Sequence, residues 1–399
     1  MGAKRGKQMK TIYIDCTSSV PIKNQPFHGG RNYIYLFLLE MQKRSYPEHE
    51  FILLFPTGYS PGNVFENLIY NNENYKIQHV KSLSDNLNLN EDSTFFLPLL
   101  YRLEDFKALR NIKHTNPTVR LIATVHDLRN QFNKYGSLSR YYYTGLAYHF
   151  YFLQKPARWL LNTFILNPAI RRGIRLIDTI FTISNYSLQE IMKQKFKGNI
   201  IPYFQTIKPV ESNNTPITEH KYFLFVSGNR AVKNLLRTLE AFCLFKKTDE
   251  NEYYLYVTGM NEQMLGNFLR YKKIDKNIVE KWVRVFGYVD DTELDNLYKN
   301  CSILLFTSLA EGFGLPILEA AQFNKPSISS YTSSIPEVLG GCTHYINPYD
   351  VISILKGMEY MSQKHIINQY ETWLSECYPT LENRIKIDMD VIIHHITCN

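Results

Sequence analysis

The sequence of 399 residues contains no run of about 18 uncharged apolar residues, the length that a membrane-spanning helix requires. Its opening, MGAKRGKQMK, lacks the apolar core of a secretory signal peptide, and Gly6 stands where an N-myristoylation signal needs serine or threonine. The six cysteines never form a C-x-x-C pair, so they indicate neither a zinc site nor a disulfide framework. These absences favour a protein of the reducing cytoplasm with a short basic tail at its N-terminus.

The composition is that of a globular chain, with 44% apolar and 21% charged residues, and the length suits two domains. The formal charge of +8, together with 29 Tyr and 24 Phe, is compatible with nucleic acid, with an anionic membrane or simply with a basic protein. No known nucleic-acid-binding motif occurs, so we expect no nucleic-acid partner.

The first half of the chain predicts alternating strands and helices. The segments 11–16 (TIYIDC) and 51–56 (FILLFP) predict buried strands, and the apolar-rich segment 31–44 between them predicts a helix. Two more strands, within 120–128 and 178–184, run into polar residues. In open α/β sheets ligands bind beyond the carboxyl ends of the strands.

A stretch with three prolines and no helical period, residues 201–220, predicts a connection between domains. Beyond it, strands are predicted at 222–228, 252–259, 284–289 and 302–308, and helices at 234–246 and 292–300. Strands that alternate with helices imply a parallel sheet.

We therefore predict an α/β fold of two domains with parallel sheets. The first domain is predicted at 1–205 and the second at 206–382. A C-terminal helix, 383–399, is expected to pack back on the first domain.

The stretch LAEGFGLPILEAAQF follows a predicted strand and predicts the start of a helix near Leu315, because Pro316 sits where a first helical turn tolerates proline. The free amides and positive dipole end of such a helix suit a phosphate group. Gly312 and Gly314 would let the backbone approach a ligand closely.

Glu311 and Glu319 flank this turn, and two carboxylates beside a phosphate would repel it. The conflict disappears if each accepts hydrogen bonds from neutral hydroxyls on either side of the phosphates, as the sugar and the ribose of a nucleotide sugar would offer. The alternative is that Glu319 only complements the helix dipole and Glu311 is a solvated loop residue.

A second basic element lies in SGNRAVKNLLRTLEAF, where Arg230 and Lys233 stand near a predicted helix start. Cations there oppose the helix dipole, and they make sense if an anion is bound. A solvated basic turn is the alternative.

The segment FGYVDDTELDNLYKNCSILLFTSLAEGFGLPILEAAQFNKPSISSYTSSIPEVLGG resembles the signature of the retaining glycosyltransferases of family 4, with its E-x7-E element at Glu311 and Glu319. The first half resembles that family more loosely, through HGGRNYIYLFLLEM, TVHDL and TISNYSLQEI. The resemblance implies the GT-B fold, two facing Rossmann-like lobes with a central cleft.

The resemblance also implies roles for individual residues. Glu311 would face the donor sugar, and Glu319 would hold the ribose diol. Arg230 and Lys233 would neutralise the diphosphate, although their short spacing leaves open which of them contacts which phosphate. His126 would reach the donor sugar or its phosphate. The implied donor-binding residues further include Gly29, Gly30, Tyr288, Val289, Gly312, Phe313, Gly314 and Leu315.

Asp127, which follows His126, is expected on the acceptor side; the two residues would also suit a metal pair or an acid–base dyad. The D-x-D of Asp388 and Asp390 resembles a metal-binding motif, but it lies in the predicted final helix, where a solvated face is the expectation. We expect no metal and no other cofactor.

The implied activity is retaining transfer of a hexose from GDP-mannose, GDP-fucose or a UDP-hexose to a glycan or a polyprenyl-linked or other lipid-linked acceptor, in bacterial surface polysaccharide or lipopolysaccharide synthesis. The leaving phosphate would help to deprotonate the acceptor on the same face of the sugar. The alternatives are a non-catalytic subunit that binds nucleotide sugar, and a GT-B epimerase or phosphorylase.

The segment 139–175 interleaves basic residues with aromatic ones, a pattern that suits an interfacial helix on anionic lipid. Our hypothesis is that it docks the first lobe on the inner face of the membrane, so that the protein is cytoplasmic and peripheral. Two ordinary amphipathic helices that close the lobe are the alternative.

Overall fold

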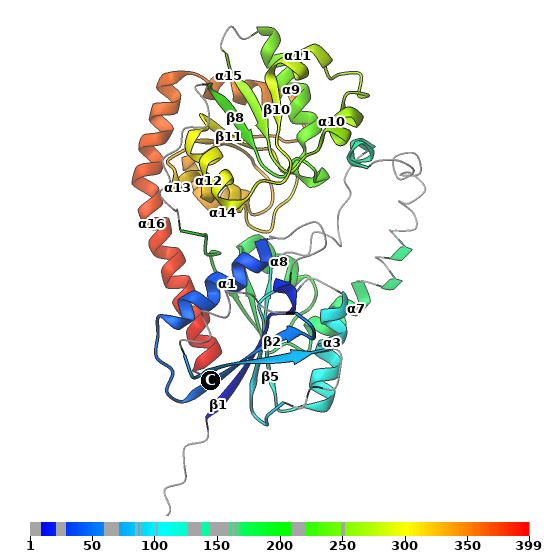
Figure 1. Cartoon of the computed structure of the whole chain (residues 1–399), viewed down its shortest axis with the longest axis vertical. Helices are drawn as coiled ribbons and strands as arrows, with labels where there is room; N and C mark the ends of the chain where they lie inside the picture. Colours follow the sequence, from blue (N-terminus) through cyan, green and yellow to red (C-terminus); the bar gives the residue numbers. More distant parts are fainter. Residues whose placement is uncertain are drawn as a thin grey trace, which may run out of the picture. The chain divides into compact units, whose positions relative to one another are not determined.

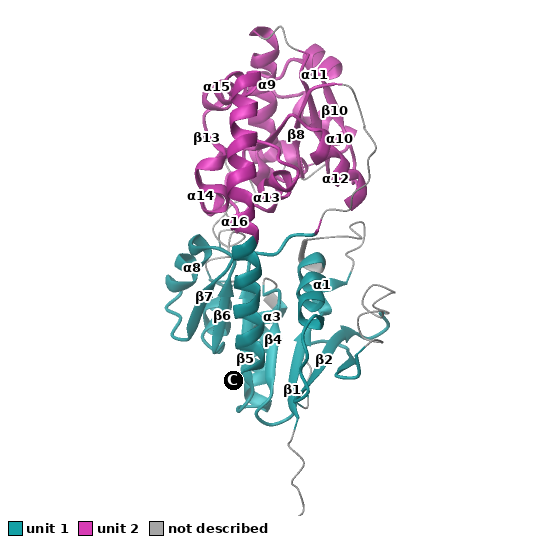
Figure 2. Ribbon diagram, turned by 90° about the vertical axis from the view of Figure 1, so that its left-hand side faces the viewer, with its two compact units in different colours: residues 1–131, 160–208, 383–399 teal, residues 132–159, 209–382 magenta. Residues whose placement is uncertain are grey.

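The computed structural model describes residues 9–20, 29–59, 72–83, 87, 89–100, 103–126, 137–143, 160–161, 164–165, 167–209, 220–248 and 252–398. The chain divides into two compact units (Figure 2). Unit 1 comprises residues 1–131, 160–208 and 383–399, and unit 2 comprises 132–159 and 209–382. The two units account for the whole chain, and each is built on its own sheet.

Unit 1 contains a seven-stranded sheet in the order β3-β2-β1-β4-β5-β6-β7, in which all neighbouring strands are parallel. Its strands are β1 (Lys10–Asp15), β2 (His49–Pro56), β3 (Tyr75–Val80), β4 (Thr94–Leu97), β5 (Arg120–Val125), β6 (Thr179–Thr182) and β7 (Asn199–Pro202). Its helices include α1 (Gly29–Gln42), α3 (Leu103–Thr115), α7 (Asn167–Ile174), α8 (Asn185–Met192) and the 3-10 helix η1 (Thr17–Ser19).

The inner strands of unit 1 form where the sequence has near-continuous apolar runs, because the middle of a parallel sheet is covered on both faces. All four residues of β4, TFFL, are buried. Helices α3 and α7 pack closely at Gly173. A Cβ there would lie 2.8 Å from the ring of Phe106, so only glycine fits without a shift. The strands and the helix predicted in the first half are confirmed.

Unit 2 contains a six-stranded parallel sheet in the order β10-β9-β8-β11-β12-β13. The strands are β8 (Tyr222–Phe225), β9 (Tyr254–Val257), β10 (Val283–Val285), β11 (Ile303–Phe306), β12 (Ser327–Ser330) and β13 (His344–Ile346). The helices include α9 (Leu235–Thr248), α10 (Glu262–Phe268), α11 (Lys276–Trp282), α12 (Asp291–Asn300), α13 (Leu315–Gln322), α14 (Ile335–Leu339) and α15 (Val351–Met361) (Figure 1). Short 3-10 helices are η2 (Ser137–Tyr142), η4 (Ala231–Lys233) and η5 (Gly340–Cys342).

The segment 137–143 was predicted within the first domain and groups with unit 2 instead. Tyr141 is buried in the core of unit 2, and the Tyr142 hydroxyl accepts a hydrogen bond from the Leu236 amide at 3.0 Å. The Asn267 side chain donates to the Tyr143 carbonyl at 2.9 Å. Aromatic side chains that pack against α9 and α10 thus place this segment in the second unit.

The final helix, α16 (Lys364–Thr397), starts earlier than predicted and contributes residues to both units. Its last part packs on unit 1, where Asp388 accepts a hydrogen bond from the Phe204 amide at 2.8 Å and Arg120 donates to the His395 carbonyl at 2.9 Å. Among the described residues, none of the helices is both long and apolar enough to span a membrane.

Both sheets have a point where the strand order reverses. In unit 2 the strands β8, β9 and β10 follow one another in one direction and β11, β12 and β13 in the other, so the order reverses between β8 and β11. In unit 1 it reverses between β1 and β4. Such switch points are where open α/β sheets bind ligands, beyond the carboxyl ends of the strands.

Candidate functional site

A buried ion pair occupies the switch point of unit 2. Lys233 follows β8 and Glu311 follows β11, and the Lys233 Nζ lies 2.8 Å from the Glu311 Oε1. The two side chains are only 6% and 7% exposed. The Lys233 ammonium also lies 4.7 Å from the centre of the Phe306 ring, a cation–π contact. Two of the predicted site residues are therefore brought together, as partners of each other.

The position of Lys233 is fixed by the backbone that follows it. Asn234 has a left-handed conformation with φ of 69°, and its side-chain amide donates to the carbonyls of Thr307, at 3.2 Å, and Pro348, at 2.7 Å. The Leu309 amide donates to the Val232 carbonyl at 2.8 Å. Lys233 thus lies in a 3-10 turn that is tied to the end of β11, and α9 begins only at Leu235.

The loop that carries Glu311 is tied to the segment after β12. The Glu311 amide donates to the Ser333 hydroxyl at 2.8 Å, and the Ser334 hydroxyl lies 2.9 Å from the carbonyl oxygens of both Glu311 and Phe313. Gly312, Phe313 and Gly314 are buried. These bonds hold the loop in one conformation ahead of α13.

Helix α13 begins at Leu315, as predicted, with Pro316 in its first turn. Gly314 precedes it with φ of 128° and ψ of 43°, a conformation that L-residues rarely adopt. The first amides of a helix have no partner within the helix. Pro316 has no amide hydrogen and the Ile317 amide donates to the Gly314 carbonyl at 3.0 Å, so it is the Leu315 amide that this helix start offers to an anion.

Glu319 lies within α13, half-buried, and accepts a hydrogen bond from the Tyr298 hydroxyl on α12 at 2.6 Å to its Oε2. Burial raises the pKa of Glu319, while the Tyr298 hydrogen bond and the charge of Lys233 oppose that rise. Burial raises the pKa of Tyr298 well above its ordinary value. Tyr298 therefore stays protonated and holds one carboxylate oxygen in place.

The remaining predicted residues of unit 2 lie on loops at the same edge of the sheet. Arg230 is exposed and begins the 3-10 turn, and its side chain contacts no partner among the described residues. Tyr288 is 53% exposed and Val289 is half-buried, in the loop between β10 and α12. All these residues follow carboxyl ends of neighbouring or nearby strands.

Strained backbone gathers in this region. Six non-glycine residues in the described part of the chain have positive φ, and three of them, Ser227, Asn234 and Ser333, belong to the loops just described. Such conformations persist only where the surroundings impose them, and they cluster at functional sites. The concentration around Lys233 and Glu311 marks the region as a site on grounds other than charge.

In unit 1 the predicted His126 follows β5, and its Nε2 lies 3.1 Å from the Pro98 carbonyl oxygen after β4. Its ring meets the ring of Tyr33 edge-on, with 4.7 Å between the centres. Gly29 and Gly30 form the start of α1. The predicted Asp127 lies outside the described residues.

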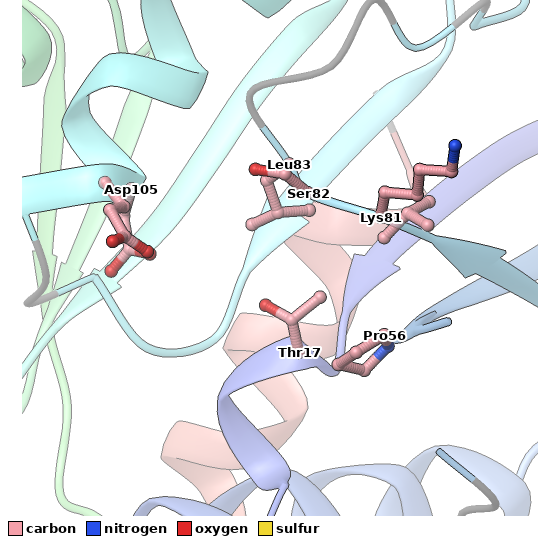
Figure 3. A pocket seen from close by; sticks show the side chains of 8 residues that line it. Thr17, Pro56, Lys81, Ser82, Leu83 and Asp105 are labelled. Atoms are coloured by element: carbon pink, nitrogen blue, oxygen red, sulfur yellow. The ribbon is translucent and has the colours of Figure 1, made fainter. Parts of the chain in front are cut away.

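A pocket of about 140 Å³ lies at the carboxyl edge of the unit 1 sheet (Figure 3). Thr17 follows β1, Pro56 ends β2, Val80 ends β3, and Asp105 stands in the first turn of α3 after β4. The rest of the lining comes from Lys81, Ser82, Leu83 and Glu104. The pocket therefore spans the switch point of unit 1, between β1 and β4.

The D-x-D of α16 has a structural role. Asp388 accepts from the Phe204 amide, and Asp390 forms an ion pair with Arg44. Within the described part of the chain, no group of three or more His, Cys, Asp or Glu residues is arranged to hold a metal ion.

Sequence reasoning missed Tyr298, Asn234 and Ser333, which hold Glu319, Lys233 and Glu311 in place. Tyr298 and Ser333 lie within the segment that resembles the family signature. The resemblance therefore included both residues but implied no role for either. Their roles depend on contacts between elements, which no local pattern records.

Residues 208–365 match the protein family described as Glycosyl transferases group 1. The chain is 32% identical over 133 residues to an O-antigen chain mannosyltransferase B of Escherichia coli, a stretch that covers 33% of this chain and 34% of that protein. It is 25% identical over 256 residues to the O-antigen chain mannosyltransferase RfbU of Salmonella typhimurium LT2, which covers 64% of each chain.

Among solved structures, the fold resembles that of Anabaena Alr3699/HepE, crystallised in complex with UDP and glucose, with a TM-score of 0.63. The identity is 12%, and the match covers 98% of both chains. The predicted α/β fold class with parallel sheets is confirmed, and the structural neighbours are GT-B glycosyltransferases. The Lys233–Glu311 pair lies within residues 208–365, which match the glycosyltransferase group 1 family.

Proposed function

We propose that the protein is a retaining glycosyltransferase that moves a hexose from a nucleotide-diphosphate sugar to a glycan or lipid-linked acceptor. The observation that carries this proposal is the buried Lys233–Glu311 pair at the switch point of unit 2, beside the N-terminus of α13, within the group 1 domain. A buried charge pair is weak evidence for stability, because hydrophobic residues of similar volume often stabilise a fold as well. A role in binding or catalysis explains its presence better.

The diphosphate of the donor would be held by Lys233, Arg230 and the Leu315 amide at the start of α13. Arg230 supplies exposed positive charge, while that of Lys233 is shared with Glu311 at rest. On the nucleotide side, Tyr298 holds the Oε2 of Glu319, so that the Oε1 can accept from a ribose hydroxyl. Tyr288 and Val289 stand on the loop where the base would lie.

Catalysis would rest on the charge that develops on the leaving diphosphate. Preorganised cations and amides that face such charge lower the barrier because they need no reorganisation during the reaction. Glu311 would accept hydrogen bonds from the donor sugar, and His126 would reach the sugar or its phosphate. The acceptor would attack from the face that the diphosphate leaves, with a phosphate oxygen taking the acceptor proton, which retains the anomeric configuration. We propose that this charge stabilisation needs no metal.

The acceptor would bind unit 1, whose pocket offers hydroxyl and carboxylate groups for sugar hydroxyls, from Thr17, Ser82, Glu104 and Asp105. The named relatives are O-antigen mannosyltransferases, which favours a mannosyl donor and a surface polysaccharide or lipopolysaccharide product. GDP-mannose is therefore the first donor to test, with GDP-fucose and UDP-hexoses beside it.

The proposal is tested in two steps. A thermal-shift panel of GDP-mannose, GDP-fucose, UDP-glucose and UDP-galactose should identify one donor class that raises the unfolding temperature, because a ligand that binds the folded state stabilises it. Release of the nucleoside diphosphate from that donor, with NMR of the product anomer, then reports transfer and stereochemistry. Glu319→Gln and Glu311→Ala should both lower turnover, and Lys272→Met, at an exposed position of unit 2, should not.

The other outcomes separate the rival functions. Donor binding without release by the parent protein would indicate a non-catalytic subunit. Conversion of the donor without an acceptor would indicate an epimerase or phosphorylase. Stabilisation by none of the four donors, or full turnover in Glu311→Ala, would overturn the proposal.

A further inference from the structure

The positive charge of this protein is concentrated in one part of the sequence. The chain carries 45 Lys and Arg against 37 Asp and Glu, a net charge of +8. Between Asp127 and Asp178 there is no acidic residue, while eight basic residues occur there: Arg129, Lys134, Arg140, Lys155, Arg158, Arg171, Arg172 and Arg175. Cations and anions elsewhere in the chain are therefore equal in number, and this segment accounts for the whole excess.

Large apolar side chains are exposed near the end of the same segment. Leu160 and Leu161 are 49% and 46% exposed, and Phe164 and Ile165 are 67% and 55% exposed. Single exposed apolar residues are common on soluble proteins. Four within six positions form a local apolar patch, and such patches mark surfaces that contact a protein or a membrane.

Helix α7 follows this patch and places cations beside it. Its Ile170, Gly173 and Ile174 are buried, with Gly173 against Phe106 of α3. Arg171 and Arg172 are exposed, as is Arg175 just after the helix. The inward face of α7 is therefore used for packing within unit 1, and the outward face is cationic.

The cationic area extends to the end of α8. The Arg171 Nε donates to the Gln194 side chain at 3.0 Å, which brings the two segments together. Next to Gln194, Met192 is 60% exposed and Lys195 is exposed. A separate element thus adds a fifth exposed apolar side chain, Met192, and another cation, Lys195.

We propose that unit 1 docks on an anionic phospholipid bilayer through the 160–175 surface, defined as Leu160, Leu161, Phe164, Ile165, Arg171, Arg172 and Arg175. Apolar side chains enter the boundary between headgroups and acyl chains, and arginines pair with anionic headgroups. The occupant is a bilayer because the surface combines exposed apolar groups with an excess of positive charge. Nucleic acid would pair with the cations and could stack on Phe164, but it would leave the aliphatic Leu160, Leu161 and Ile165 without a role.

This surface is smaller than the segment 139–175 predicted to dock. Its first residues, 139–143, pack in unit 2 through Tyr141 and Tyr142, so their aromatic character is explained by the core. The docking proposal does not rest on the proposed activity, since it concerns exposed residues of unit 1 that lie outside the donor site.

The test is flotation of the full chain with vesicles of phosphatidylglycerol and phosphatidylcholine in equal parts, beside vesicles of phosphatidylcholine alone. The parent should float with the anionic vesicles only. Arg172→Glu with Arg175→Glu should lower the bound fraction by a factor of about ten or more, since each basic residue near an anionic surface contributes about 1 kcal/mol. Phe164→Ser with Ile165→Ser should lower it several-fold at high salt, where the electrostatic attraction is screened.

Matched controls come from exposed positions of unit 2. Lys272→Glu with Lys356→Glu makes the same charge change, and Ile352→Ser removes an apolar side chain that is 48% exposed. These variants should float like the parent, and thermal unfolding should show all variants folded. Flotation of the arginine variant equal to that of the parent would overturn the proposal. So would binding of single-stranded RNA that both arginine substitutions abolish and the Phe164 and Ile165 substitutions leave unchanged.

Discussion

Units 1 and 2 both contain a parallel sheet whose strand order reverses at one point, but different groups occupy that point. In each, a 3-10 helix follows the strand on one side of the switch point, η1 after β1 and η4 after β8. In unit 2 this turn delivers Lys233 to Glu311, and the switch point is filled by a buried ion pair. In unit 1 the corresponding turn, with Thr17, borders a pocket of about 140 Å³.

The comparison shows that the shared topology determines where a site lies but not which chemical groups it contains. Charges are preorganised in unit 2, which suits a ligand of constant chemistry such as a diphosphate. Unit 1 offers a pocket lined by hydroxyl, carboxyl and apolar groups and one lysine, Lys81, which suits a ligand rich in hydroxyls. The family signature lies in the unit with the fixed charges, as expected if that ligand is the invariant partner of the reaction.

The largest effect is expected from Lys233→Met. It leaves the Glu311 carboxylate buried without its partner, which should lower the free energy of unfolding by about 3–5 kcal/mol. Turnover should fall by a factor of about 10²–10³, as when one preorganised donor is removed from a site. Denaturant unfolding and diphosphate release measure the two effects.

The matched change in unit 1 is Lys76→Met, which removes the exposed ion pair between Lys76 and Glu50. It should change the free energy of unfolding by about 1 kcal/mol or less. The double variant Lys233→Met with Glu311→Leu should recover much of the lost stability and none of the turnover. Recovery of both would mean that the pair only supports the fold.

A second prediction concerns Gly314, whose φ of 128° excludes other residues without strain. Gly314→Ala should lower the free energy of unfolding by about 1–3 kcal/mol and raise the KM for the donor. In unit 1, Gly58 has φ of 80° with open space around it, so Gly58→Ala should show about 1 kcal/mol of strain and no change in KM. An unchanged KM in Gly314→Ala would contradict close approach of the donor to this turn.

A third prediction follows from the raised pKa of Glu319. A carboxyl group whose pKa is raised by folding is unfavourable when ionised, so its penalty is present above the folded-state pKa and absent below the unfolded value, about pH 4. Glu319→Gln should therefore raise the unfolding temperature near pH 8, and this gain should vanish near pH 4. It should also weaken donor binding, so that stability and function move in opposite directions. A lower unfolding temperature at pH 8 would contradict the assignment.

Tyr298→Phe should have a smaller effect. The loss of one hydrogen bond to a carboxylate should raise the donor KM about five- to tenfold with little change in kcat. Because the Tyr298 hydrogen bond lowers the pKa of Glu319, the acid limb of donor binding should move to higher pH. The control is Tyr222→Phe, which removes a buried hydroxyl that donates to the Leu297 carbonyl. Equal KM changes in the two variants would show a general effect on the fold.

The smallest effect is expected from removal of divalent metals. If Lys233, Arg230 and the Leu315 amide supply the charge that opposes the diphosphate, then EDTA should change turnover less than about twofold. A loss that Mg²⁺ restores would mean that unit 2 does not carry enough positive charge of its own.

Much of the fold could be predicted because apolar runs record burial locally. The strands β8 and β11 follow from YFLF and ILLF, and the start of α13 follows from Pro316 and the glycines before it. The residue types of the site could also be proposed locally, but solvated turns explain the same cations and carboxylates, and it was the family resemblance that favoured a site.

The pairing within the site could not be predicted. Lys233 and Glu311 meet because β8 and β11 are neighbours in the sheet, and strand order is a property of the whole unit. The same limit applies to Tyr298 and Glu319, which lie on different helices. Tyr141 and Tyr142 were ambiguous because an aromatic run suits a core as well as an interface, and only packing against α9 and α10 decides.

The C-terminal part of α16 has a consequence for biosynthesis. Met389, Ile392, Ile393 and Ile396 are buried, and the helix there bonds to Arg120 and to the Phe204 amide of unit 1. The ribosome makes these residues after all of unit 2. Unit 1 is thus completed only after unit 2 has been synthesised. During synthesis its sheet keeps one apolar flank uncovered until residues 383–398 have left the ribosome.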